Sequence, residues 1–160
     1  MKSEEQFLEL IDTYFPRNHE FLKLGRGDDC AVLAGGKEMC VSSDLFIEDV
    51  HFRHEYFTAE DIGYKALAVN LSDIAAMGGS PRYLYLGLAC PDEAEISDID
   101  AFLRGVLAET AKYGVSLGGG GTCTSPGPWT STVSAEGSAA RAHAVRRAGV
   151  PPGELTRVSG

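Results

Sequence analysis

Apolar residues recur at helical spacing between residues 59 and 79, and the rest of the predicted fold is arranged around this stretch. They form two adjacent stripes: Ile62, Ala66, Val69, Ala76 and Met77 in the first, and Leu67, Leu71 and Ile74 in the second. Thr58 and Asp61 form a capping box at the start, and Gly78 begins a Gly-Gly-Ser-Pro run that ends the pattern. A helix that is apolar around most of its girth is buried, so we expect a long helix in the core.

Asp73 is the one carboxylate on the first stripe, one turn after Asn70. A buried carboxylate without a partner carries a large desolvation cost, so Asp73 must be paired or must bind a cation. A structural hydrogen bond to nearby backbone is the alternative explanation.

Shorter patterns predict the remaining elements. Alternation over residues 82–90, with Leu84, Leu86, Leu88 and Cys90 on one face, predicts a half-buried strand. Further strands are expected at residues 31–33, 39–43, 115–117, 130–135 and 155–159, the first two as a hairpin, with an irregular or strand-like segment at 46–51 and a loop at 22–29. Helices are expected at residues 3–15 and from Pro91 to Tyr113, the second with Gly114 as the C-cap and with an apolar face formed by Ile99, Phe102, Leu103, Val106 and Leu107. This order predicts an α+β fold with a mixed or antiparallel sheet flanked by helices.

Composition narrows the class of protein. The chain has 160 residues, 44% of them hydrophobic, which suits one globular core. A net charge of −9 argues against a nucleic-acid partner, because such proteins present a basic face. The four cysteines have no metal-ligand spacing and are expected to be reduced thiols: Cys30, Cys40, Cys90 and Cys123. With no signal-peptide pattern and no apolar run of membrane-spanning length, we expect a cytoplasmic protein with no membrane partner.

Three acidic segments are candidates for binding a cation: Asp28-Asp29, Ser42-Ser43-Asp44 and Asp73. Magnesium prefers oxygen ligands, and it is usually held by one or two carboxylates together with phosphate oxygens. A common turn is the alternative for the Gly-Asp-Asp step, and a strand-end hydroxyl turn is the alternative for Ser-Ser-Asp.

Other candidates give weaker signals. His51 follows Asp44 by seven residues, although a lone histidine is more often structural or on the surface. The glycines at 118–121 could cradle a phosphate with backbone N–H groups, or could form an ordinary flexible turn. Arg147 could hold a phosphate, or could be solvated surface.

Five motifs occur in the order of one known family: GDDCAVL, SSDLFIEDVHF, YKALAVNLSDIAAMGGSPRY, LGGGGT and RRAGVPPGEL. Over about residues 5 to 160 the chain resembles the thiamine-monophosphate kinases, within the wider aminoimidazole-ribonucleotide synthase superfamily. The resemblance implies the N-terminal domain of that superfamily, whose sheet is completed to a barrel by homodimerisation. It also implies ATP- and magnesium-dependent phosphorylation of thiamine monophosphate to thiamine diphosphate.

The resemblance also implies roles for individual residues. The implied magnesium ligands are Asp29, Ser42, Ser43, Asp44 and Asp73. His51 matches a substrate contact, and the implied ATP-binding positions are Tyr113, Gly120, Gly121 and Arg147.

The sequence departs from the family in two respects. Gly121 stands where the family carries an aspartate that holds magnesium. The family's chain is about twice as long, so residues 1–160 are expected to form a single N-terminal magnesium- and ATP-binding domain without the family's second domain. Two other functions therefore stay open: a non-catalytic dimerisation or nucleotide-binding module, and a related enzyme that uses another phosphate acceptor.

Overall fold

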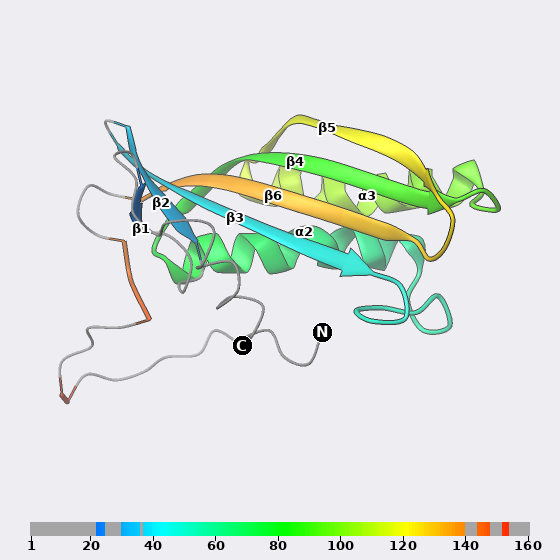
Figure 1. Cartoon of the computed structure of the whole chain (residues 1–160), viewed down its shortest axis with the longest axis horizontal. Coiled ribbons are helices and arrows are strands. Elements are labelled where there is room, and N and C mark those ends of the chain that lie inside the picture. The colour runs from blue at the N-terminus through cyan, green and yellow to red at the C-terminus, as the bar shows by residue number, and fades with distance from the viewer. Residues whose placement is uncertain (1–21, 25–29, 36, 140–143, 148–151, 154–160) are drawn as a thin grey trace, which may run out of the picture.

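The computed structural model describes residues 22–24, 30–35, 37–139, 144–147 and 152–153, which form one sheet with two helices on one of its faces (Figure 1). Three predictions lie outside the described residues: the helix at 3–15, the strand at 155–159, and the Asp28-Asp29 pair. In the described part of the chain, no helix combines the length and the apolar character needed to cross a membrane.

The sheet has six strands in the order β1-β2-β3-β6-β4-β5. Their bounds are Leu22–Leu24 (β1), Ala31–Gly35 (β2), Lys37–Ile47 (β3), Ser80–Pro91 (β4), Ser116–Ser125 (β5) and Thr130–Ala139 (β6). Only β4 and β5 pair in parallel, and every other neighbouring pair is antiparallel. The helices are α2 (Ala59–Ala76) and α3 (Ile96–Tyr113), which confirms the α+β fold with a mixed sheet.

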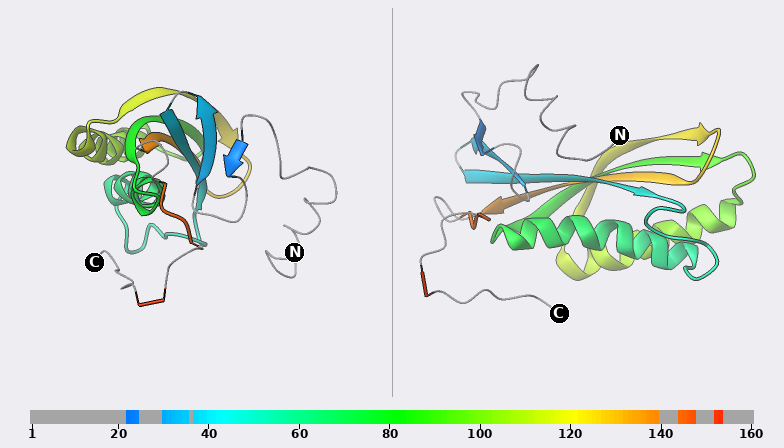
Figure 2. Two further views of the ribbon diagram at one scale, coloured as in Figure 1. Left: turned by 90° about the vertical axis from the view of Figure 1, so that its left-hand side faces the viewer. Right: turned by 60° about the horizontal axis from the view of Figure 1, so that its bottom comes forward.

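Figure 2 shows both helices packed on the same side of the sheet. Apolar side chains that alternate along β3, β4 and β6 point toward the helices and form the core with them, among them Phe46, Leu84, Leu86, Leu88 and Val133. Residues on the opposite face, including Leu45, Tyr83 and Tyr85, are 58%, 49% and 38% exposed. The sheet therefore has one covered face and one open face among the described residues.

The cap of α2 is as predicted. Asp61 N–H donates to Thr58 Oγ1 at 3.1 Å, and Thr58 N–H donates to Asp61 Oδ2 at 3.0 Å. The two helices cross in very close contact, because a Cβ on Gly63 would lie 2.0 Å from the Phe102 carbonyl oxygen and one on Gly105 would lie 2.0 Å from that of Glu60. Only glycine allows this approach.

The expected burial of α2 around most of its girth is wrong. Its buried residues lie on one side, while Ala75 and Ala76 are exposed and Asp73 is half-buried. The sheet and α3 cover only part of the helix surface, so its other side faces outward. Asp73 therefore lies at the edge of the core and not within it.

Several expected boundaries also differ. Helix α3 starts at Ile96 after Glu95, and Pro91 is the last residue of β4, because β4 stays paired with β5 up to that point. Leu103 and Leu107, expected on the apolar face of α3, are 44% and 65% exposed. β1 occupies part of the expected loop at 22–29, and β3, β5 and β6 are longer than predicted because each is stabilised by pairing with a neighbouring strand.

Candidate functional site

Strand β3 and helix α2 bring three of the predicted magnesium ligands together. Ser42 Oγ donates a 2.6 Å hydrogen bond to Asp73 Oδ2, although the two residues are 31 positions apart. Asp44 lies two residues further along β3, on the same helix-facing side as Ser42. These oxygen-bearing side chains therefore share one end of the β3–α2 edge.

The pKa of Asp44 is affected both by its burial and by the carboxylate of Asp73. Burial raises the pKa of Asp44 above its ordinary value, and the negative charge of Asp73 raises it further, while His51 opposes the shift. A half-buried carboxylate whose proton affinity is raised by a second carboxylate marks a place where a divalent cation would relieve repulsion.

Asp44 and His51 both line a groove of about 430 Å³ along this edge. We call it the β3–α2 groove, and its lining residues are Asp44, Leu45, Phe46, Val50, His51, Lys65 and Val69. One wall comes from β3 and the turn that follows it, and the other wall comes from α2. The predicted substrate contact and a predicted metal ligand therefore border the same space.

Backbone hydrogen bonds fix His51 in the turn after β3. Ile47 N–H donates to His51 Nδ1 at 3.0 Å, and His51 N–H donates back to the Ile47 carbonyl at 2.8 Å. The ring also stacks on Phe46, with 5.6 Å between the centroids. Because Nδ1 accepts a hydrogen bond, the proton of the neutral ring lies on Nε2, which is then a donor.

The donor set fits magnesium in kind. Carboxylate and hydroxyl oxygens are the hard ligands that this ion prefers. Within the described ranges, however, no group of three or more His, Cys, Asp or Glu residues is placed to hold a metal ion. Asp29, the predicted third carboxylate, lies outside those ranges, so the structure places only Asp44 and Asp73 together.

Ser43 does not join this group through its side chain. Successive residues of a strand point to opposite faces, and Ser43 Oγ lies 2.8 Å from Ser134 Oγ on the open face of the sheet. Of the two adjacent serines, only Ser42 reaches Asp73.

The glycine run at 118–121 forms neither a phosphate-cradling loop nor a flexible turn. It belongs to β5, the exposed edge strand that pairs with β4. A Cβ on Gly120 would lie 1.9 Å from the Leu86 carbonyl oxygen, whereas one on Gly121 would meet nothing within 4 Å. The run therefore lets β5 lie directly against β4.

Strand register places Gly120 far from the groove within one chain. Asp44 pairs with Val133, Val133 with Leu86, and Leu86 with Gly120, so these residues share one row across the sheet. Three interstrand spacings separate Asp44 from Gly120 by roughly 14 Å. Gly121 falls in the next row, with Leu45, and so faces the open side.

The other two predicted ATP contacts also lie outside the groove lining. Tyr113 is the last residue of α3, with the Lys112 ammonium 4.9 Å from its ring centroid. Arg147 is exposed in the segment 144–147. Val145 N–H in that segment donates to the Met77 carbonyl at 3.1 Å, which places the segment beside the C-terminal end of α2, one turn beyond Asp73.

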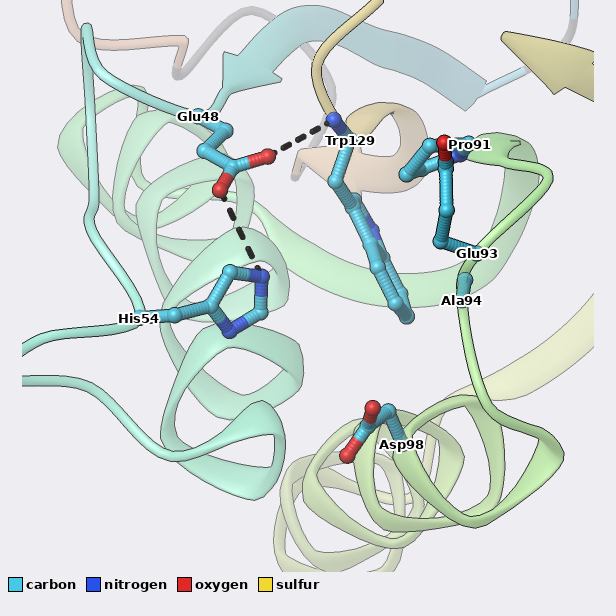
Figure 3. Close-up of a pocket in the computed structure, with 7 residues that line it drawn as sticks. All are labelled: Glu48, His54, Pro91, Glu93, Ala94, Asp98 and Trp129. Atoms are coloured by element: carbon cyan, nitrogen blue, oxygen red, sulfur yellow. Dashed lines mark hydrogen bonds and ion pairs between the residues drawn. The ribbon is translucent and has the colours of Figure 1, made fainter.

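A second pocket, of about 380 Å³, is bordered by the turn after β3 and by the connection between β4 and α3 (Figure 3). Glu48 contacts two other lining residues, because its Oε2 accepts from Trp129 N–H at 2.9 Å and its Oε1 lies 3.9 Å from His54 Nε2. Glu93 and Asp98 line the far wall. Nothing in the sequence pattern singled out this pocket, because its residues come from the segment after β3, the end of β4 and the loop that follows, the first turn of α3 and the residue before β6.

Lys65, which lies within the YKALAVN motif, is a further residue of this site that the sequence pattern did not predict. Its Nζ donates to the His51 carbonyl at 3.2 Å and it lines the β3–α2 groove. The only signal that could have identified it is its helical spacing, because Lys65, Val69 and Asp73 follow one another at intervals of four residues.

Comparison with known proteins supports a family for this chain. A family model described as AIR synthase related protein, N-terminal domain, matches residues 27–139. The thiamine-monophosphate kinase of Bacillus subtilis (strain 168) is 38% identical over 156 residues, covering 95% of this chain and 48% of the relative. That of Escherichia coli (strain K12) is 36% identical over 156 residues, covering 94% of this chain and 47% of the relative.

Solved structures give the same picture. AaThiL complexed with AMPPCP and TMP has a TM-score of 0.82 and 28% identity, covering 92% of this chain and 45% of that one. Thiamine-monophosphate kinase from Stenotrophomonas maltophilia K279a has a TM-score of 0.65 and 40% identity, covering 81% and 40%. The chain spans about half the length of the curated relatives it matches.

Proposed function

The chain belongs to the family of AIR synthase related proteins and carries its N-terminal domain, and on that premise we propose that it is the magnesium- and ATP-binding half of a thiamine-monophosphate kinase. The observation that carries the proposal is the meeting of Ser42, Asp44 and Asp73 beside a groove that also contains His51. Relatives named thiamine-monophosphate kinase, and a neighbour complexed with AMPPCP, an ATP analogue, and TMP, supply the substrates proposed.

Phosphoryl transfer depends mainly on positioning and on neutralising charge. Asp44 and Asp73 would hold magnesium, with Asp29 as a further predicted ligand and Ser42 orienting Asp73 through its hydrogen bond. The bound ion supplies the positive charge that lets two phosphate-bearing substrates approach a protein whose net charge is −9. No side chain in the groove needs to act as a covalent catalyst.

His51 would contact the phosphate acceptor. Its backbone hydrogen bonds and its stacking on Phe46 hold the ring in one orientation before any ligand arrives. Neutral His51 would then offer its Nε2–H as a donor at a fixed position, and such preorganisation lowers the cost of orienting the substrate.

We also propose that the protein acts as a homodimer. The open face of the sheet exposes Leu45, Tyr83 and Tyr85, which a second copy would cover. Gly120 lies roughly 14 Å from Asp44 within one chain, so ATP bound at β5 would lie away from the carboxylates of the same chain. The ATP contacts of Gly120, Tyr113 and Arg147 stay predictions. The cytoplasmic location also stays a prediction.

The test compares Asp44→Asn with Asp49→Asn, measuring melting temperature with and without millimolar magnesium and phosphorylation of thiamine monophosphate. Asp49 is a matched control, because it lies five residues away, its side chain is 76% exposed, and its φ of 63° suits asparagine. We expect magnesium to raise the melting temperature of the wild type and of Asp49→Asn but not of Asp44→Asn, because a ligand that binds only the folded state stabilises it.

Retention of the magnesium shift in Asp44→Asn would contradict the proposed site. Removal of the Asp44 charge should also leave the metal-free protein at least as stable as the wild type, since it ends the repulsion with Asp73. Magnesium-dependent nucleotide binding without turnover would instead favour a nucleotide-binding module, a reading supported by the missing carboxylate at Gly121. Turnover with a different acceptor would identify a related phosphotransferase.

A further inference from the structure

Lys65 places a positive charge in the β3–α2 groove without a carboxylate partner in the described part of the chain. No ion pair among the described residues includes it. Its ammonium donates to the His51 carbonyl at 3.2 Å and lies 4.9 Å and 5.5 Å from the ring centroids of Phe57 and Phe46. A lysine ammonium has three donors, so this single hydrogen bond leaves two of them for another acceptor.

The surroundings hold this ammonium in place. Two aromatic faces and one backbone carbonyl restrict the long side chain, which would otherwise lose considerable freedom on binding a ligand. Lys65 is also only half-exposed. A preorganised cation that keeps free donors in a groove is suited to binding an anion.

Lys65 and the carboxylates of Asp44 and Asp73 give the two ends of the groove opposite charges. Lys65 and Asp73 lie eight residues apart along α2, which is about 12 Å along the helix axis. Asp44 and His51 line the groove with Lys65. An anion held between the two ends would therefore meet the cation-binding carboxylates on one side and an ammonium on the other.

We propose that Lys65 binds the phosphate group of a phosphate monoester in the β3–α2 groove. This rests on the proposed function for the identity of the ester, but the anion contact itself follows from the free donors and the groove. The competing role is purely structural: Lys65 would only tie α2 to the turn at residues 47–51 through the His51 carbonyl. The two roles differ in whether anion affinity depends on the charge at position 65.

The experiment titrates the whole chain with inorganic phosphate in the absence of magnesium and nucleotide, following binding by calorimetry. We expect Lys65→Met, which keeps a long apolar side chain, to weaken phosphate binding by about tenfold to hundredfold, the range for a hydrogen bond to a charged group. Lys65→Arg should recover most of the affinity, because it restores the charge.

Arg104→Met is the control for loss of one positive charge. Arg104 pairs with Asp100 and lies 3.7 Å from Glu60 on the exposed side of the helices, outside the groove lining. Its loss should change phosphate affinity by less than about twofold, since exposed charges at a distance are screened.

Wild-type affinity in a folded Lys65→Met variant, or equal weakening by Arg104→Met, would overturn the proposal. If Lys65→Met does not fold, the wild type still provides a test through the NMR shift of the Lys65 side chain during the phosphate titration. An unchanged shift at saturating phosphate would also overturn it. Neither measurement needs nucleotide or turnover, so the result for Lys65 stays valid even if the protein does not phosphorylate thiamine monophosphate. In the same way, a negative result for phosphate binding at Lys65 does not affect the magnesium test of Asp44.

Discussion

Asp44 in β3 and Gly120 in β5 lie in the same row of residues across the sheet. Polar side chains that could bind a ligand nevertheless come together at the β3–α2 edge and not along β5. At the β3–α2 edge, Ser42, Asp44 and Asp73 come from two elements and meet beside a groove. In β5, Gly120 and Gly121 carry no side chain, and nearly every residue of the strand is exposed. The resemblance implied functional positions in both regions, but among the described residues of a single chain the candidate side chains come together only at the β3–α2 edge.

The reason for the difference is the packing of each strand. β3 is paired on both sides, by β2 and β6, and α2 contacts its covered face. The pairing with β2 ends at Val41, so β6 and α2 are the neighbours that hold Ser42 and Asp44 in place. In the described part of the chain β5 pairs only with β4, and nearly all of its residues are exposed. A second molecule or domain would have to supply what β5 lacks.

The largest predicted effect separates the two adjacent glycines of β5. Gly120→Asp should lower the free energy of unfolding by about 2 kcal/mol or more, because its Cβ would collide with the Leu86 backbone and part β5 from β4. Gly121→Asp should change it by less than about 0.5 kcal/mol, because that position is open. Urea denaturation of both variants measures the difference, and equal stabilities would show that β5 does not pack on β4 as described.

Strong periodicity was enough to predict the central elements. The capping box of Thr58 and Asp61, the length of α2 and the alternation of β4 are all local signals, and the structure confirms them. The glycine run was mispredicted because its conformation is decided by pairing with β4, which no local pattern records. Pro91 misled for the same reason, since strand pairing carries β4 through a residue that usually precedes a helix.

For the candidate site, the sequence was enough to suggest which residues could bind a cation, but not which way each side chain faces or how far it is buried. It could not tell that Ser42 and Ser43 face opposite sides, because the register of β3 against β6 sets the face. It overestimated the burial of Asp73, because the extent of cover on α2 is a tertiary property. It passed over Lys65, because a lysine on a helix resembles ordinary surface until the groove that it lines is known.

The second prediction uses the two serines to sharpen the comparison within β3. Ser42→Ala should weaken magnesium binding by about tenfold, or about 1.4 kcal/mol, because Asp73 loses the hydroxyl that orients it. Ser43→Ala removes only a hydroxyl contact with Ser134 on the open face, so its magnesium affinity should stay within about twofold. Calorimetric titration with magnesium measures both, and equal losses would place both side chains at the metal.

The smallest predicted effect concerns the helix that carries Lys65 and Asp73. Thr58→Ala removes the N-cap of α2 and should lower the free energy of unfolding by about 1 kcal/mol at neutral pH. Thr58→Ser keeps the hydroxyl and should stay within a few tenths of a kcal/mol of the wild type. Amide hydrogen exchange should show faster opening in the first turn of α2 and no change in β5, because the cap touches only the helix.

The same cap makes this difference depend on pH. The hydroxyl of Thr58, and then its backbone N–H, donate to Asp61 and lower the pKa of that carboxyl below its ordinary value. A lowered pKa in the folded state means that the stabilisation is complete above the ordinary aspartate pKa and is lost as the pH falls through the folded value. The gap between wild type and Thr58→Ala should therefore be widest near pH 7 and should narrow in acid, as denaturation at several pH values would show. If the difference in unfolding free energy between wild type and Thr58→Ala instead widens in acid, the ionised Asp61 does not stabilise the start of α2. The α2 wall of the groove would then be held in place only by packing against the sheet and α3.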